Sequence, residues 1–315
     1  MDTEYDLIVI GAGSTGENVA DRAVQGGLKV VIVEDELVGG ECSYWACMPS
    51  KALLRSGEAL RAARAVPGAA QAVTGELDVA AVLARRDTFT SNWDDHSQVE
   101  WLEGAGIDLV RGRGQITAVR EVTVRLSDGG SRILRARHAV AVCTGSTALV
   151  VDIPGLRDAE PWTSRDATSV KEVPESLAII GGGVVACEMA TAFTDLGALV
   201  TIISRGRLLE GMETFVGDAV ADRLRDRGAQ VMLDTETASV ARGDDGVTIT
   251  TNTGETVNAA EVLVATGRKA HTEGLGLDVV GLTDGDWLDV DDTMRVQGVD
   301  WLYAVGDVNH RVLLT

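Results

Sequence analysis

A glycine-rich turn between an apolar strand and a helix occurs twice in this chain of 315 residues. Residues 6–25 read DLIVIGAGSTGENVADRAVQ, and residues 176–195 read SLAIIGGGVVACEMATAFTD. Each begins with a continuous apolar run, which is typical of a parallel strand buried on both faces. A second apolar run follows each helix, KVVIVE at 29–34 and ALVTIIS at 198–204. The pattern predicts two βαβ units, and hence an α/β chain with two Rossmann-like domains.

The first glycine turn has the features of a dinucleotide-binding site. Gly11, Gly13 and Gly16 have the spacing that lets the backbone approach a pyrophosphate at the start of a helix. Glu34 ends the second strand, where a carboxylate can accept a hydrogen bond from a ribose hydroxyl. These features together favour a dinucleotide site over the glycine turns that occur in unrelated α/β proteins.

The second glycine turn has the same spacing with alanine in its third position, which is an accepted variant. Its three residues are Gly181, Gly183 and Ala186. The strand that follows ends without an acidic residue, at Ser204, Arg205 and Arg207. Arginines at this point can pair with a 2′-phosphate, so the sequence favours NADP over NAD. The alternative is that both arginines are solvated surface residues.

Two cysteines, Cys42 and Cys47, lie in the segment GGECSYWACMPSK at 39–51. A zinc site usually takes four ligands in two close pairs. The other cysteines, Cys143 and Cys187, stand alone in apolar surroundings and are expected to be core thiols, and the four histidines are scattered. We therefore expect no metal here and favour a disulfide.

The residues after the second cysteine suggest a reactive thiol. Pro49 predicts a helix that begins just after Cys47, and the positive end of that helix would favour a thiolate. Cys42 lies before the helix, so a bridge requires irregular backbone at the helix entrance. Lys51 lies in the first turn, where an acid would be the usual choice, so we expect it to have a partner such as a flavin or a carboxylate.

The chain is strongly acidic, with 48 Asp and Glu against 28 Lys and Arg and a formal charge of −20. This balance argues against nucleic acid or an anionic membrane as the main partner. No apolar run approaches the ~20 residues of a membrane span, and no basic segment precedes the first strand. We expect a cytoplasmic protein, in which a disulfide is more often catalytic than structural.

Six motifs in the same order resemble those of the class I flavoprotein disulfide oxidoreductases, the family of dihydrolipoamide dehydrogenase, glutathione reductase and mercuric reductase. They are GAGSTG with Glu34, GGECSYWACMPSK, CTGS at 143–146, GGGVVACE at 181–188, ATGR at 265–268 and AVGDV at 304–308. The resemblance implies an FAD-binding domain formed by residues 1–148 and 272–315. It also implies an NAD(P)-binding domain at 149–271. Each domain would have a central parallel sheet with an added antiparallel meander.

The resemblance also implies site residues. The implied FAD contacts are Gly11, Gly13, Gly16, Glu34, Gly40, Lys51, Gly114, Thr144, Gly145, Ser146, Gly306, Asp307 and Thr315. The implied NAD(P)H contacts are Gly181, Gly183, Ala186, Ser204, Arg205, Arg207 and Gly267.

In the implied reaction, electrons pass from NAD(P)H through the flavin to a Cys42–Cys47 disulfide and on to a dithiol, disulfide or similar small acceptor. Cys47 would be the charge-transfer thiolate near the ring, and Cys42 would exchange with the acceptor. Lys51 would lie by the flavin and pair with Glu188. The aromatic pair between the cysteines, Tyr44 and Trp45, departs from the small residues that are usual in the family.

The largest departure is at the C-terminus. Family members continue into a dimerisation domain that carries a His–Glu pair, whereas this chain ends at RVLLT. We therefore expect a truncated form of a homodimeric protein, which could be monomeric by itself. The alternative function is a cofactor-binding fragment, or a quinone or dye reductase in which the disulfide does not turn over.

Overall fold

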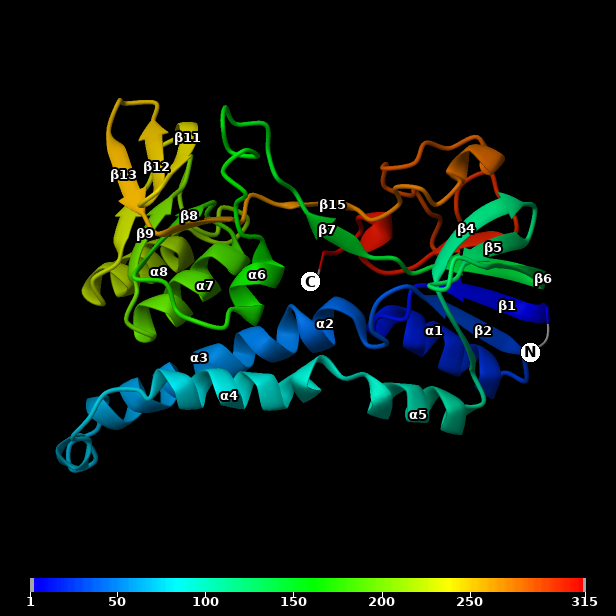
Figure 1. The fold of residues 1–315 in the computed structure, drawn as a ribbon, viewed down its shortest axis with the longest axis horizontal. Helices are drawn as coiled ribbons and strands as arrows, with labels where there is room; N and C mark the ends of the chain where they lie inside the picture. Colours follow the sequence, from blue (N-terminus) through cyan, green and yellow to red (C-terminus); the bar gives the residue numbers. More distant parts are fainter. Residues whose placement is uncertain (1–2, 314–315) are drawn as a thin grey trace. The chain divides into compact units, whose positions relative to one another are not determined.

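The computed structural model describes residues 3–313. By packing, these residues divide into two compact units: the described parts of 1–44, 91–147 and 268–315, and residues 45–90 with 148–267 (Figure 1). Parallel strands form the core of each unit, so the expected α/β class is confirmed. Packing groups residues 45–90 with the second unit, whereas the expected division placed them in the first. The assignment of each domain to a cofactor stays a prediction.

The first unit contains a seven-stranded sheet in the order β3-β2-β1-β6-β5-β4, and β16 also pairs with β6. The parallel strands are β1 (Glu4–Ile10), β2 (Val30–Glu34), β3 (Asp108–Arg111), β6 (Ser131–Val142) and β16 (Leu302–Ala304). The antiparallel meander adds β4 (Arg113–Ala118) and β5 (Glu121–Arg125). The long strand β6 serves both parts, because its first half pairs with β5 and its last residues lie between β1 and β16.

Alternating side chains of β1 build two apolar layers in this unit. Leu7 and Val9 pack in a cluster with α1 (Ser14–Gln25) and α5 (His96–Ala105). Ile8 and Ile10 pack in the other cluster, with the meander and the C-terminal segment. Figure 1 shows α1 and α5 beneath the strands of this sheet. The remaining short elements are α2 (Gly40–Tyr44), η2 (Ser91–Trp93), β7 (Ser146–Ala148), β15 (Arg268–Ala270), η3 (Leu277–Val280) and η4 (Asp307–Asn309).

The second unit contains a four-stranded parallel sheet in the order β10-β9-β8-β14 and a separate meander β11-β12-β13. The parallel strands are β8 (Ser176–Ile180), β9 (Leu199–Ile203), β10 (Gln230–Met232) and β14 (Glu261–Val264). The meander strands are β11 (Thr237–Gly243), β12 (Gly246–Thr251) and β13 (Thr256–Ala259). The helices are α3 (Cys47–Ala65), η1 (Ala70–Ala72), α4 (Val79–Phe89), α6 (Ser164–Ser169), α7 (Val184–Asp195) and α8 (Thr214–Asp226).

Two helices differ from their expected bounds. The helix predicted from Pro49 begins two residues earlier, at Cys47. The sequence at 78–106 predicts mostly helix, but the structure interrupts it, because the three consecutive residues Ser91, Asn92 and Trp93 all have positive φ angles of 51–57°. A regular helix cannot accommodate that conformation, so α4 ends at Phe89 and α5 begins at His96. Among residues 3–313, no helix combines the length and apolar character that a bilayer crossing requires.

Candidate functional site

The two glycine turns share one packing arrangement. Gly11 has a φ of +100°, and a Cβ atom there would lie 2.5 Å from the carbonyl oxygen of Cys143. Gly181 has a φ of +136°, and its Cβ atom would overlap the carbonyl oxygen of Ala265. In each unit, therefore, a neighbouring strand end occupies the space of a side chain, and only glycine fits. These contacts bring the CTGS motif to the first turn and the ATGR motif to the second.

Each glycine turn leads directly into a helix whose first N–H groups are not capped by a side chain. Gly13 is the N-cap of α1 and Gly183 is the N-cap of α7, and neither helix start has a side-chain capping hydrogen bond. Ala186 is buried in the first turn of α7. Uncapped N–H groups at a helix start favour an anion such as a pyrophosphate.

Glu34 holds the first turn from the end of β2. Its Oε2 accepts the Ala12 N–H at 2.7 Å, and its Oε1 accepts the Glu36 N–H at 2.8 Å. Burial raises the pKa of this carboxyl, which is 9% exposed. Each oxygen keeps a second lone pair, so a ribose hydroxyl could still donate to it. That role stays a prediction.

The sequence analysis missed Glu17, which directly follows the third glycine in the first turn of α1. Its Oε1 is buried and has no hydrogen-bond partner among the described residues. Burial, helped by the charge of Glu34, raises the pKa of Glu17 to about 7. The Thr144 hydroxyl is also buried and without a hydrogen bond in the described part of the chain. Orphaned polar atoms beside an uncapped helix start are what a polar cofactor would satisfy, so these residues fit a bound dinucleotide.

Three motifs meet at the buried hydroxyl of Ser146. Ser146 Oγ donates to Asp307 Oδ2 at 2.7 Å, and Arg268 Nε donates to the same Oγ at 2.6 Å. Arg268 Nη2 also donates to the Ser146 carbonyl at 2.6 Å. Gly306 packs against Thr15 of the first turn, where a Cβ atom would lie 2.9 Å from Oγ1. Arg268 was not among the expected site residues, although it lies in the ATGR motif.

The remaining expected FAD contacts lie as follows. Gly40 packs against the first turn, since a Cβ atom there would lie 2.7 Å from Gly13 Cα. Gly114 faces the core, and a Cβ atom would lie 3.2 Å from Ile10 Cγ2. The Gly145 carbonyl accepts the His271 N–H at 3.1 Å. Thr315 lies outside the described residues.

The boundary between the two units falls inside the cysteine segment, after Tyr44. In the first unit, Cys42 is half-buried in α2, whose start is held at the first glycine turn by the hydrogen bond from Gly39 N to Ala12 O at 2.7 Å. In the second unit, Cys47 is the half-buried first residue of α3. The backbone before it is irregular, as predicted, with φ −127° and ψ −95° at Ala46.

Trp45 lies against α6 of the second unit. Its carbonyl accepts a hydrogen bond from Thr168 Oγ1 at 2.8 Å, and the Arg165 guanidinium lies 4.2 Å from the centre of its ring. The sequence left the role of Trp45 open. These contacts show that Trp45 packs, and that it connects the backbone before Cys47 to a neighbouring helix.

Lys51 has the partner that was expected. Its Nζ lies 2.6 Å from Glu188 Oε1, and this ion pair joins α3 to α7 within the second unit. Lys51 also donates to Ser50 Oγ at 3.2 Å. Because Cys47 and Lys51 are four residues apart on one helix, the thiol and the ammonium group share a helix face.

The two arginines after β9 have different surroundings. Arg207 is committed to its own loop, where it donates to Thr214 Oγ1, to Glu210 O at 2.8 Å and to Met212 O at 3.1 Å. Arg205 is exposed and has no hydrogen bond or ion pair in the described part of the chain. Ser204 is buried, and its hydroxyl lies where a side chain at Gly182 would be. Gly267, whose carbonyl accepts the Leu149 N–H at 3.0 Å, follows the strand end at the second turn.

Cys143 and Cys187 are core thiols, as expected. Both are buried, and burial raises their pKa to about 12 and about 11. No cluster of three or more His, Cys, Asp or Glu side chains suitable for a metal ion is present within residues 3–313.

The sequence and the structure of this chain are both similar to those of known proteins. Residues 5–315 match the family model described as pyridine nucleotide-disulphide oxidoreductase. A mercuric reductase of Acidithiobacillus ferrooxidans is 33% identical over 309 residues, which cover 96% of this chain and 56% of the relative. A dihydrolipoyl dehydrogenase of Chlorobaculum tepidum is 34% identical over 322 residues, which cover 99% of this chain and 67% of the relative.

Among solved structures, the HOCl-induced flavoprotein disulfide reductase RclA of Escherichia coli, in its Cu(II) complex, superposes with a TM-score of 0.87 at 22% identity. The superposition covers 100% of this chain and 68% of RclA. At that identity the match shows the shared fold. The chain spans little more than half the length of three of the mercuric reductases that it matches, and 66% of a fourth, from Streptomyces lividans.

Proposed function

Because this chain belongs to the pyridine nucleotide-disulphide oxidoreductase family, we propose that it carries the electron-transfer part of an FAD-dependent NAD(P)H oxidoreductase. The proposed acceptor within the chain is a disulfide between Cys42 and Cys47. The proposed final acceptor is a small disulfide or a similar two-electron acceptor, which is the class that the names of its relatives suggest.

The arrangement of Cys47, Lys51 and Glu188 supports this proposal most directly. The Lys51 cation lies one helical turn after Cys47, on the same helix face, and Cys47 itself is at the helix start. The Glu188 carboxylate, 2.6 Å from the Lys51 ammonium, keeps this cation in place.

The residues near the first glycine turn would hold FAD. Gly13 and the start of α1 would bind its pyrophosphate, Glu34 a ribose hydroxyl, and Asp307 the ribityl chain. When bound, the flavin would accept hydride from NAD(P)H and supply two electrons to a disulfide. The second turn and α7 would hold the nucleotide, and Arg205 is the better placed of the two arginines for a 2′-phosphate, because Arg207 is occupied in its loop.

The thiol chemistry then follows from the pair of cysteines. The Cys42–Cys47 bond takes up two electrons and one proton, which gives one thiol and one thiolate. Cys42 attacks the acceptor disulfide and displaces one thiolate, and Cys47 then attacks the mixed disulfide and releases the second. The ammonium of Lys51 stabilises the Cys47 thiolate between these steps.

Thiol counting by mass spectrometry tests the proposal. Anaerobic addition of NADPH to the FAD-loaded, oxidised protein should make Cys42 and Cys47 open to alkylation, while the buried Cys143 and Cys187 stay unmodified. The proposal fails if NADPH consumption leaves both cysteines unchanged. Dye reduction that survives the double variant Cys42→Ser, Cys47→Ser would instead support a reductase in which the disulfide does not turn over.

A further inference from the structure

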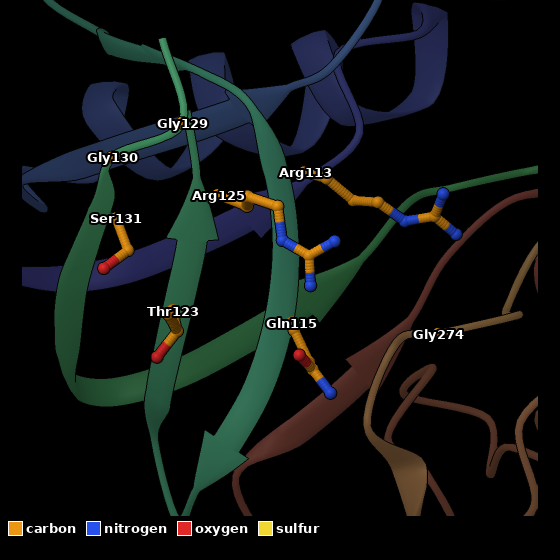
Figure 2. Close-up of a pocket in the computed structure, with 8 residues that line it drawn as sticks. All are labelled: Arg113, Gln115, Thr123, Arg125, Gly129, Gly130, Ser131 and Gly274. Carbon is orange, nitrogen blue, oxygen red and sulfur yellow. The ribbon is translucent and has the colours of Figure 1, made fainter. Parts of the chain in front are cut away.

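We propose that the outward face of the first unit's meander binds a phosphoryl dianion, as a site separate from the cofactor turns. A cavity of about 390 Å³ lies there, within the size range of small-ligand sites. Its lining residues are Arg113, Gln115, Thr123, Arg125, Gly129, Gly130, Ser131 and Gly274. Figure 2 shows Arg125 and Gln115 over the strands of the meander, and the Arg113 side chain extending from them toward the loop of Gly274.

The register of the sheet places two positive charges directly opposite each other. Arg113 of β4 is the cross-strand partner of Arg125 of β5, and Gln115 is the partner of Thr123 two residues along. Ser131 of β6 is the partner of Arg125 on its other side. Like charges at directly opposed positions destabilise a sheet. An anion between the two arginines would remove this cost.

No carboxylate in the described part of the chain contacts either arginine side chain, so none balances these two charges directly. The Arg125 side chain has no hydrogen bond or ion pair there, and the one side-chain hydrogen bond of Arg113 goes to the backbone carbonyl of Glu273, at 2.6 Å. The Glu273 carboxylate is bound by Lys269 at 2.6 Å. This is unexpected in a chain with 48 acidic and 28 basic residues.

A third arginine on the same face of the meander is paired with a carboxylate from the neighbouring strand. Arg135 of β6 is opposite Glu121 of β5, and their side chains form an ion pair at 2.9 Å. The acidic residue nearest the β5–β6 turn, Asp128, accepts the Gly130 N–H at 2.8 Å. The two cavity arginines are therefore an exception to the pairing that the rest of this face follows.

The walls of the cavity leave room for a ligand, and one wall orients the Arg113 guanidinium. Gly274 has a φ of +72°, and a Cβ atom there would lie 3.3 Å from Arg113 Nη2. The guanidinium is thus held by the Glu273 carbonyl against Gly274, which has no side chain. Gly129 and Gly130 form the opposite wall of the cavity and likewise have no side chain to fill it.

The donor set identifies the ligand class. Guanidinium groups match the geometry of phosphate oxygens, and two of them balance two negative charges. The Gln115 amide and the Ser131 hydroxyl can donate to further oxygens. The site is distinct from the cofactor turns, because Gly114, between Arg113 and Gln115, points to the core on the other side of β4.

Calorimetric titration of inorganic phosphate into the FAD-loaded protein, with NADP⁺ in excess, tests the proposal. We expect one saturable site, whose affinity falls about tenfold or more in Arg125→Gln, as loss of a charge-assisted hydrogen bond implies. Arg135→Gln, on the same face but already paired with Glu121, is the matched control and should bind phosphate as the native protein does. Since Arg125 is exposed and opposes a like charge, its replacement should leave thermal stability unchanged or higher.

A parallel titration with glycerol 3-phosphate identifies the source of the phosphoryl group. Tighter binding of the ester would point to a phosphorylated metabolite, and equal or weaker binding to free phosphate, and both support the site. The proposal is overturned if neither probe gives saturable binding, if Arg125→Gln binds undiminished, or if Arg135→Gln loses as much affinity as Arg125→Gln.

Discussion

The Arg165 guanidinium lies 4.2 Å from the centre of the Trp45 ring, so a helix of the second unit packs on the residue between the two cysteines. The same helix provides Thr168, which donates to the Trp45 carbonyl at 2.8 Å. Two independent contacts therefore hold the irregular backbone that precedes Cys47.

Replacing Trp45 should loosen the start of α3. Trp45→Ala removes a contact worth roughly 0.5–2 kcal/mol, so the amides of residues 46–50 should exchange about tenfold faster with solvent. Hydrogen exchange followed by mass spectrometry measures this. Trp101→Ala, at a 44% exposed tryptophan, is the control and should leave that exchange unchanged. Equal protection in Trp45→Ala and the native protein would show that the contact does not hold the helix start.

Removing the carboxylate opposite Lys51 should affect reactivity more than stability. The Lys51 side chain is 62% exposed, and surface ion pairs of this kind contribute about 0–1 kcal/mol to unfolding. Glu188→Gln should therefore unfold within about 1 kcal/mol of the native protein, while reduction of the disulfide by NADPH slows roughly tenfold. Stopped-flow thiol release and urea denaturation provide the two readouts.

Glu58→Gln is the matched control for that variant, because Glu58 pairs with Arg55 on the same helix at 3.0 Å. It should change neither readout. A Glu188→Gln protein that reduces its disulfide at the native rate would argue against a role for the ion pair in the reaction.

Arg205 and Arg207 should differ in their effect on nucleotide preference. Arg205→Ala should raise the KM for NADPH about tenfold and leave the KM for NADH unchanged, since one phosphate contact is lost. Arg207→Ala should lower thermal stability and weaken the binding of NADPH and NADH to the same extent, because Arg207 holds the loop through Glu210 and Met212. Steady-state kinetics with NADPH and with NADH measures both KM values in each variant. An unchanged NADPH-to-NADH ratio in Arg205→Ala would contradict the assignment.

Glu17 should make stability depend on pH near neutrality. Its pKa is raised from 4.5 to about 7 by burial, so the folded state holds a proton that the unfolded state has lost between these values. The free energy of unfolding should therefore decrease as pH rises from 4.5 to 7. Glu17→Gln should reduce this decrease and leave the part contributed by the buried Glu34 carboxyl, as measured by urea denaturation of the apoprotein at pH 5 and pH 7.5.

Asp21→Asn, one turn further along α1, is the control for Glu17 and should keep the native pH dependence. Bound FAD should reduce the effect in the native protein, if it satisfies the buried Glu17 oxygen. A native apoprotein whose stability does not change between the two pH values would show that Glu17 is not protonated in the folded state.

The sequence by itself was enough for the two βαβ units, their glycine turns and the α/β class. These depend on contacts between near neighbours along the chain, which leave a regular pattern of apolar residues and glycines. The Lys51–Glu188 pairing was also anticipated, but from a family resemblance, since 137 residues separate the partners. The break at Ser91–Trp93 was missed, because nothing in the composition of that segment demands positive φ angles.

Only the tertiary structure decided which polar groups are buried and which charges are paired. It buries one carboxyl oxygen of Glu17 near the charge of Glu34, occupies Arg207 with its own loop, and gathers Ser146, Arg268 and Asp307 into one network. It also sets Arg113 opposite Arg125, and no carboxylate within residues 3–313 forms an ion pair with either side chain. The physical reason is that burial and charge pairing depend on what long-range packing brings to each side chain, and local sequence patterns carry no record of those neighbours.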